Sequence, residues 1–177
     1  MTEEIDAAHA QQMDPLTLAV LQAEYHRARS GWGQPPQLYA LARKEALADA
    51  SSQLLPGIRK APAGSFIPVE QGPLPEGEPL DVLAGIDWPD DVAGCVLVTE
   101  VVIVSPDAQR EAPSDPDEME RWARDQPGTR EARLAVGVLR SGDHACVLRL
   151  QGDDGVRIDP QLADDLVTAL LETFISG

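Results

Sequence analysis

The chain has 177 residues, of which 30 are acidic and 14 are basic, and its formal net charge is −16. This length allows a sizeable core without disulfide or metal support, and the apolar content is ordinary for a globular protein. Because each contact with a phosphate requires a Lys or Arg, the charge argues against nucleic acids and anionic membranes as partners.

The N-terminal segment is expected to lie outside the folded domain. Residues 1–13 are acidic and lack the apolar run of a signal peptide, so we expect a disordered tail there. No apolar run approaches the roughly 18 residues that cross a bilayer. We therefore expect a single domain over residues 14–177, with no membrane insertion and a cytoplasmic location.

Two helices are predicted in the N-terminal part. Asp14 can cap a helix and Pro15 suits the first helical position, so the first helix should begin there and end near Ser30. A second helix should follow over residues 36–50. Its apolar face would consist of Leu38, Leu41, Ala42 and Leu47.

Two segments in the middle of the chain are predicted to be extended. Residues 66–69 read as an edge strand or a loop, because Pro68 cannot donate a ladder hydrogen bond. Residues 95–104 are apolar on both faces, which predicts a central strand covered on both sides. Glu100 is the single charge in this strand, and it is either solvated at a less covered edge or a buried functional carboxylate.

The C-terminal part is predicted to contain a β-hairpin between two helices. Asp115-Pro116 begins a short helix that ends near Arg124, and Asp159-Pro160 begins the last helix in the same way. A three-residue loop over 141–143 predicts the hairpin. Its register would place Leu134 opposite Leu150, Val136 opposite Leu148, and Val138 opposite Cys146. The last helix would carry an apolar stripe of Leu162, Leu166, Leu170 and Phe174.

Strands grouped between terminal helices favour an α+β fold. We expect an antiparallel sheet of about four strands that is covered by the N-terminal and C-terminal helices.

The triplet Trp88-Pro89-Asp90 matches the loop that carries the general acid of cysteine phosphatases. In such enzymes the nucleophile lies in a Cys-x5-Arg loop, whose Arg binds the phosphate. The sixth residue after Cys95 is Val101 and the sixth after Cys146 is Gly152, so neither cysteine has this Arg. The triplet is therefore interpreted as a turn in which Trp88 packs into the core, and we assign no catalytic residue.

His144 and Cys146 lie two residues apart on a predicted strand, and therefore on one face, where both could bind a metal ion. A structural zinc site needs about four ligands. Cys95 would be the third at most, so we expect no metal and no cofactor. The two cysteines are expected to be buried and reduced, with a disulfide between neighbouring strands as the alternative.

The stretch from Ala61 to Gln109 contains nine acidic residues and no Lys or Arg. Basic residues cluster before it, at Arg27, Arg29, Arg43, Lys44, Arg59 and Lys60. The acidic loop either packs against this basic cluster or binds a basic protein partner or a divalent cation. The candidate interaction residues are Glu70, Glu76, Glu78, Asp81, Asp87, Trp88, Asp90 and Asp91.

Three blocks of the sequence resemble a family of uncharacterised, soluble actinobacterial proteins. They are SGWGQPPQLYAL over 30–41, the segment 66–100 with its Ile-x-Trp-Pro turn, and REARLAVGVLRSG over 130–142. The resemblance spans most of residues 14–175 and departs at Glu78, where the family pattern has Lys. It implies no particular activity, because none is assigned to the family.

Two functions remain as hypotheses. The first is a non-catalytic interaction or adaptor-like protein that presents the acidic loop to another protein. The alternative is a small-molecule-binding protein or enzyme with a pocket near Trp88, in which Glu100 is an acid or base with a raised pKa. The missing partners of the catalytic motifs favour the first hypothesis, and the oligomeric state is left open.

Overall fold

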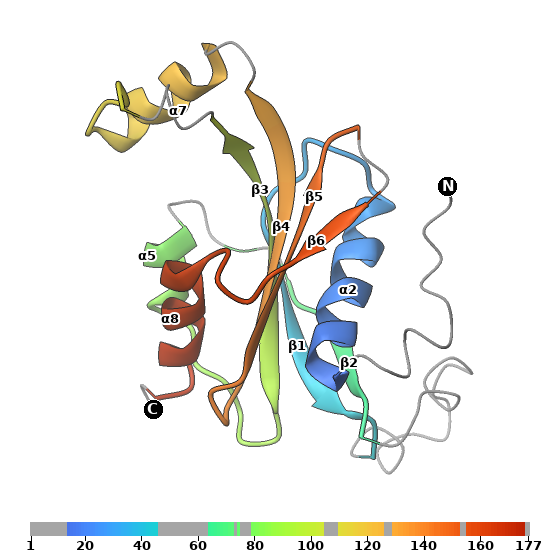
Figure 1. The fold of residues 1–177 in the computed structure, drawn as a ribbon. Coiled ribbons are helices and arrows are strands. Elements are labelled where there is room, and N and C mark those ends of the chain that lie inside the picture. Colours follow the sequence, from blue (N-terminus) through green and yellow to red (C-terminus); the bar gives the residue numbers. More distant parts are fainter. Residues whose placement is uncertain are drawn as a thin grey trace.

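In a computed structural model of the chain, a six-stranded antiparallel sheet lies between helices (Figure 1). The structure describes residues 14–45, 64–72, 74, 79–104, 110–125, 129–152 and 155–175. The strands are β1 (Gln37–Arg43), β2 (Phe66–Glu70), β3 (Gly94–Ile103), β4 (Arg130–Leu139), β5 (His144–Leu150) and β6 (Val156–Ile158). The helices are α2 (Pro15–Ala28), α5 (Pro79–Leu83), α7 (Pro116–Asp125) and α8 (Asp164–Glu172). The predicted α+β fold is confirmed, but the expected number of about four strands is too low.

Helices cover opposite faces of the sheet, whose strand order is β2-β1-β3-β4-β5-β6. α2 lies on one face, and α8 lies with α5 on the other (Figure 1). Because alternate residues of a strand point to opposite faces, the strands β1, β3, β4 and β5 contribute to both cores. On β3, Val96 and Val98 belong to the α2 side, whereas Cys95 and Leu97 belong to the α8 side. This confirms β3 as a central strand that is covered on both faces.

The helix α2 begins as the sequence predicts and packs closely on the sheet. The carboxylate of Asp14 accepts the backbone N–H of Thr17 at 3.0 Å, and Pro15 is the first helical residue. Val20 packs against Gly137 of β4, where an added Cβ would collide with the valine side chain. The missing side chain at Gly137 therefore allows the close approach of helix and sheet.

The second predicted helix is wrong, because residues 37–43 form the strand β1. This strand lies between β2 and β3, and every residue from Gln37 to Leu41 is buried. The periodicity of a short apolar run does not distinguish a buried strand from a helix. The predicted tail 1–13 and the last part of the predicted second helix, residues 46–50, lie outside the described residues.

The segment 66–70 forms an edge strand, which is the first of the two predicted alternatives. Gln71 N–H donates to the carbonyl of Leu38, and Lys44 N–H donates to the carbonyl of Ser65, both at 3.0 Å. Because hydrogen-bonded pairs alternate along an antiparallel ladder, Pro68 directs its backbone groups away from β1. The missing N–H of the proline therefore removes no ladder bond.

The β4–β5 hairpin has the predicted loop length and faces but a different register. Its loop spans Arg140–Gly142, one residue earlier than predicted, and Leu139 N–H donates to the carbonyl of Asp143 at 2.8 Å. Gly142 ends the loop with a φ of +103°, which favours glycine. The register shifts by two residues, so every side chain keeps its predicted face. The observed pairs are Leu134–Leu148, Val136–Cys146 and Val138–His144.

The helix α7 begins where the sequence predicts, whereas α8 begins later. Asp115 caps α7 by accepting the N–H of Asp117 at 3.1 Å. Asp159 instead accepts the N–H of Gln161 at 3.0 Å, which closes a local turn before α8 begins at Asp164. The predicted apolar stripe still packs into the α8-side core. None of the described helices has the length and apolar character that crossing a bilayer requires.

Candidate functional site

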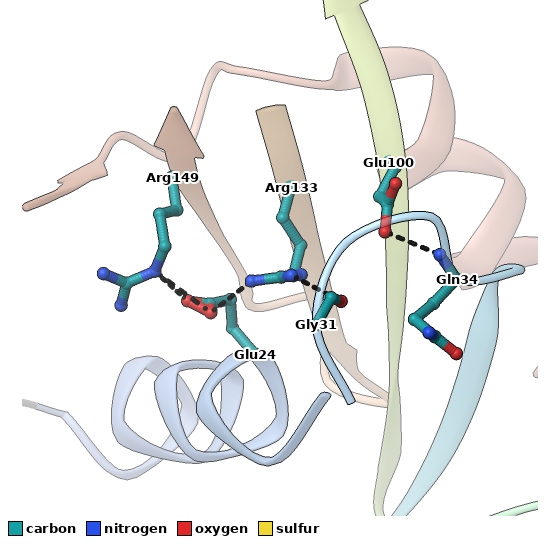
Figure 2. A network of polar contacts seen from close by, with 6 residues as sticks. All are labelled: Glu24, Gly31, Gln34, Glu100, Arg133 and Arg149. Atoms are coloured by element: carbon teal, nitrogen blue, oxygen red, sulfur yellow. Dashed lines mark hydrogen bonds and ion pairs between the residues drawn. The ribbon is translucent and has the colours of Figure 1, made fainter. Parts of the chain in front are cut away.

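A row of charged side chains crosses three strands on the face that α2 covers. Glu100 of β3 lies opposite Arg133 of β4, which in turn lies opposite Arg149 of β5. Side chains directly opposite each other in an antiparallel pair point to the same face and have Cβ atoms about 4.5–5.5 Å apart. Figure 2 shows this row together with Glu24, which reaches it from α2.

Glu24 is a buried carboxylate between two guanidinium groups. Arg149 Nε donates to Glu24 Oε1 at 2.5 Å, and Arg133 Nη1 lies 3.7 Å from Glu24 Oε2. The exposed fractions of the Glu24 and Arg133 side chains are 1% and 2%. A charge left unpaired at such a depth would cost several kcal/mol, on the order of 3–5. The two positive partners therefore make the burial of Glu24 tolerable, and they join α2 to β4 and β5.

The loop after α2, residues Gly31–Gln34, is held against this row, and we call it the strap. The carboxylate of Glu100 accepts the backbone N–H groups of Gly33 and Gln34, both at 2.9 Å. Arg133 Nη2 donates to the carbonyl of Gly31 at 3.1 Å (Figure 2). The guanidinium carbon of Arg133 lies 4.3 Å from the centre of the Trp32 ring, which is a cation–π distance.

These contacts give Glu100 a role that neither sequence hypothesis described. Its side chain is half-buried, and each carboxylate oxygen accepts a backbone N–H group from the strap. Glu100 is therefore an anchor for a loop that lies 66 residues away in the sequence.

The pocket that the sequence places near Trp88 and Glu100 is not formed in the predicted way. Trp88 packs against the α8-side core, whereas Glu100 lies on the α2 face of the sheet. A depression of about 520 Å³ lies between the N-terminus of α2 and the β4–β5 hairpin, and its lining includes Leu16, Phe66 and Asp143. Neither Trp88 nor Glu100 lines this depression.

The turn around Trp88 is a packed part of the scaffold, as predicted from the sequence. Trp88 Nε1 donates to the hydroxyl of Thr173 at 3.0 Å, and its ring stacks on Phe174 with a centroid distance of 6.0 Å. From the β4–β5 hairpin, Arg140 donates to the carbonyl of Pro89 at 2.5 Å and lies over the Phe174 ring. The turn is thus fixed both to the C-terminal end of α8 and to the hairpin.

Neither cysteine is placed to act as a nucleophile. Cys95 and Cys146 are both fully buried, and both are free thiols. Burial raises the pKa of Cys95 to about 12 and also raises the pKa of Cys146, so both remain protonated at neutral pH. The strand β4 separates the two residues, which places their backbones about 10 Å apart and beyond the reach of a disulfide.

The candidate interaction residues are divided between different surfaces. The exposed members around the turn and on α5 are Asp81, Asp87, Asp90 and Asp91. Glu70 lies opposite Tyr39 and therefore points to the α2 face, away from Trp88. Glu76 and Glu78 lie outside the described residues.

The histidines of the described part have no partners suited to metal binding. His144 is exposed while Cys146 is buried, although both lie on one face of β5. Within the described ranges, no group of three or more His, Cys, Asp or Glu side chains is arranged to hold a metal ion. His26 Nδ1 lies 3.2 Å from the hydroxyl of Tyr39, whose pKa is raised by burial and then by Glu70.

Sequence reasoning missed Glu24, Arg133 and Arg149, although each carries a signal. Glu24 follows Leu16 and Val20 at a spacing of four, which places it on the buried face of α2. Each arginine lies two residues from a buried residue of its own strand, Ala135 for Arg133 and Val147 for Arg149, and therefore on the same face as that residue. A charge at a position that periodicity assigns to the core requires a partner, but only the folded arrangement identifies that partner.

The fold and the site together define an α+β protein in which buried ion pairs join the N-terminal helix to a six-stranded antiparallel sheet. The chain belongs to the PPA1309-like protein family, whose family model matches residues 16–175. This description names no activity, in agreement with the resemblance seen in the sequence. No curated protein and no solved structure matches the chain significantly.

Proposed function

We propose that the protein is a non-catalytic cytoplasmic binding protein that engages a basic segment of another protein. The contact surface is the acidic turn, which we define as Asp87, Asp90 and Asp91. The observation that carries this proposal is the contrast between anchoring and exposure. Trp88 and Arg140 hold the backbone of the turn in place, while the three carboxylates face solvent.

The acidic turn is suited to meet cations from another molecule. In the part of the chain that the structure describes, none of its three carboxylates has an ion-pair or hydrogen-bond partner. A contact surface that is already ordered loses little conformational freedom on binding. The net charge of −16 would speed encounter with a basic partner and would repel nucleic acid.

A non-catalytic role is supported by the state of the thiols and carboxylates that catalysis could use, because they are either buried or already bound to other groups of the chain. Both thiols are buried with raised pKa values, which makes them poor nucleophiles. The carboxylates of Glu24 and Glu100 are taken up by guanidinium groups and by backbone N–H groups. Each group thus has a structural task in the fold.

The proposal is tested with two variants that lose the same number of charges. The turn variant carries Asp87→Asn, Asp90→Asn and Asp91→Asn. The matched control carries Glu111→Gln, Glu118→Gln and Glu131→Gln, which are exposed positions outside the turn. Proteins captured by the wild type are identified, purified and titrated against all three proteins by calorimetry at two salt concentrations.

We expect the turn variant to bind the captured partner about tenfold more weakly, because three exposed charge pairs contribute roughly 0.2–1 kcal/mol each. The control variant should keep its affinity within about twofold, and added salt should weaken wild-type binding. Equal affinities of the wild type and the turn variant for the same partner would rule out the acidic turn as the contact surface.

A further inference from the structure

The strap is fastened mainly by polar contacts. None of its four residues is fully buried, and Gly33 is exposed. Its contacts with the sheet are the two bonds to Glu100, the bond from Arg133 to the carbonyl of Gly31, and the packing of Trp32 on the Arg133 guanidinium. Two further bonds join it to the end of α2, from Gly31 N–H to the carbonyl of Ala28 and from Gln34 Nε2 to the carbonyl of Ser30. Segments with few buried apolar contacts open locally at a lower free energy than the core of the same protein.

The closed strap also covers a buried donor that lacks an acceptor. Arg133 is 2% exposed, and among the described residues its Nε–H has no hydrogen-bond partner. A buried donor without a partner is unfavourable, and hydration relieves this cost. Because Trp32 lies over the guanidinium, movement of the strap would admit water to it.

Two glycines on either side of Trp32 can serve as hinges. Gly31 and Gly33 have φ angles of +82° and +83°, in the left-handed region that glycine adopts at little cost. No heavy atom lies within 4 Å of a Cβ added at either position. An alanine there would be strained by its backbone conformation and not by a collision.

We propose that the strap opens as a unit while the sheet stays folded, with Glu100 as its latch and Gly31 and Gly33 as its hinges. Opening separates Trp32 from Arg133 and presents an indole and a guanidinium on the α2 face. The Trp88 turn packs on the α8 side, so this inference stands or fails independently of the proposed function.

Native-state amide hydrogen exchange of the full chain, measured by NMR, tests the proposal. In the wild type, the protection factors of the Gly33 and Gln34 amides should be at least about tenfold lower than those of Val96 and Val98. Glu100→Gln should accelerate the two strap amides by about a further tenfold, because a carboxylate is a stronger acceptor than an amide. It should leave the two sheet amides unchanged.

The matched control is Glu131→Gln, which removes an exposed carboxylate from β4 and should change neither set of amides. Equal protection factors in the strap and the sheet, or an equal effect of Glu100→Gln on both, would overturn the proposal. If Glu100→Gln does not fold, Gly33→Ala provides the second perturbation. Its strained φ should accelerate exchange of the Gln34 amide several-fold, on the order of fivefold, without changing the amides of Val96 and Val98. An unchanged Gln34 rate would overturn the proposal as well.

Discussion

At the scale of single residues, Glu24 shows how one buried carboxylate holds two arginine side chains in place. Its two oxygens face Arg149 and Arg133, and the triad is enclosed between α2 and the sheet. Buried ion pairs are often no more stabilising than apolar side chains of similar size. The triad does, however, define one position of α2 on the sheet, because a shift of one helical turn would separate Glu24 from both arginines.

Removing the charge of Glu24 should therefore be severe. Glu24→Gln is expected to lower the free energy of unfolding by about 3–5 kcal/mol, because it leaves the buried Arg133 without its counter-charge. Urea denaturation followed by circular dichroism measures this loss. The exposed Glu118→Gln removes an equal charge from α7 and should cost less than about 0.5 kcal/mol. A loss as small as that of the control would contradict the structural role of the triad.

The buried thiols should make the protein less stable in alkaline solution. Burial raises the pKa of Cys95 to about 12, whereas a cysteine in the unfolded chain ionises near pH 8.5, roughly its ordinary pKa. The contribution to stability is thus fully present below about pH 8.5 and is lost as the pH rises towards the pKa of the folded state. Urea titrations near neutral pH and near pH 10 should show a smaller alkaline loss in Cys95→Ala than in the wild type. The same loss in both proteins would contradict this expectation.

At the scale of elements, β2 shows how an edge strand tolerates a proline. Pro68 lies opposite Leu41, at a position whose backbone groups point away from β1. Edge strands that present a continuous row of free N–H groups invite pairing with another chain, and proline interrupts that row.

Pro68→Val should therefore promote self-association without weakening the fold. The substitution adds one outward-facing N–H group to β2, and no ladder bond to β1 is gained or lost. Sedimentation velocity should detect dimers or larger species at concentrations where the wild type sediments as a smaller species. Pro89→Val, in the turn before β3, is the control and should not associate more than the wild type. A Pro68→Val variant that sediments like the wild type would show that the proline does not guard this edge.

The elements also show how far sequence patterns reach. The cap of Asp14 and the doubly apolar pattern of 95–104 correctly predict α2 and β3, because both signals are local. The hairpin keeps its predicted faces because a two-residue shift preserves the alternation of side chains. The region 37–43 fails as a helix because burial between β2 and β3 outweighs helical periodicity.

At the scale of the whole molecule, the sheet separates two polar features that the sequence does not distinguish. The ion row and the strap lie on the α2 side, and the anchored Trp88 turn packs on the α8 side. This separation explains why Trp88 and Glu100 cannot share one pocket, although they are only 12 positions apart in the sequence. Twelve residues suffice for the chain to enter β3 and alternate between its faces.

The sequence alone accounts for the acidic character of the chain, the caps of α2 and α7, the central strand β3 and the lack of a Cys-x5-Arg loop to accompany Trp88. These properties depend on composition or on residues that are close together in the chain. The folded chain is needed to show that 37–43 is a strand, that Glu24 contacts Arg133 and Arg149, and that Glu100 anchors the strap. Each of these outcomes depends on residues that are distant in the sequence. A buried charge needs a partner of opposite charge or a hydrogen bond, and folding decides which residues lie close enough to provide it.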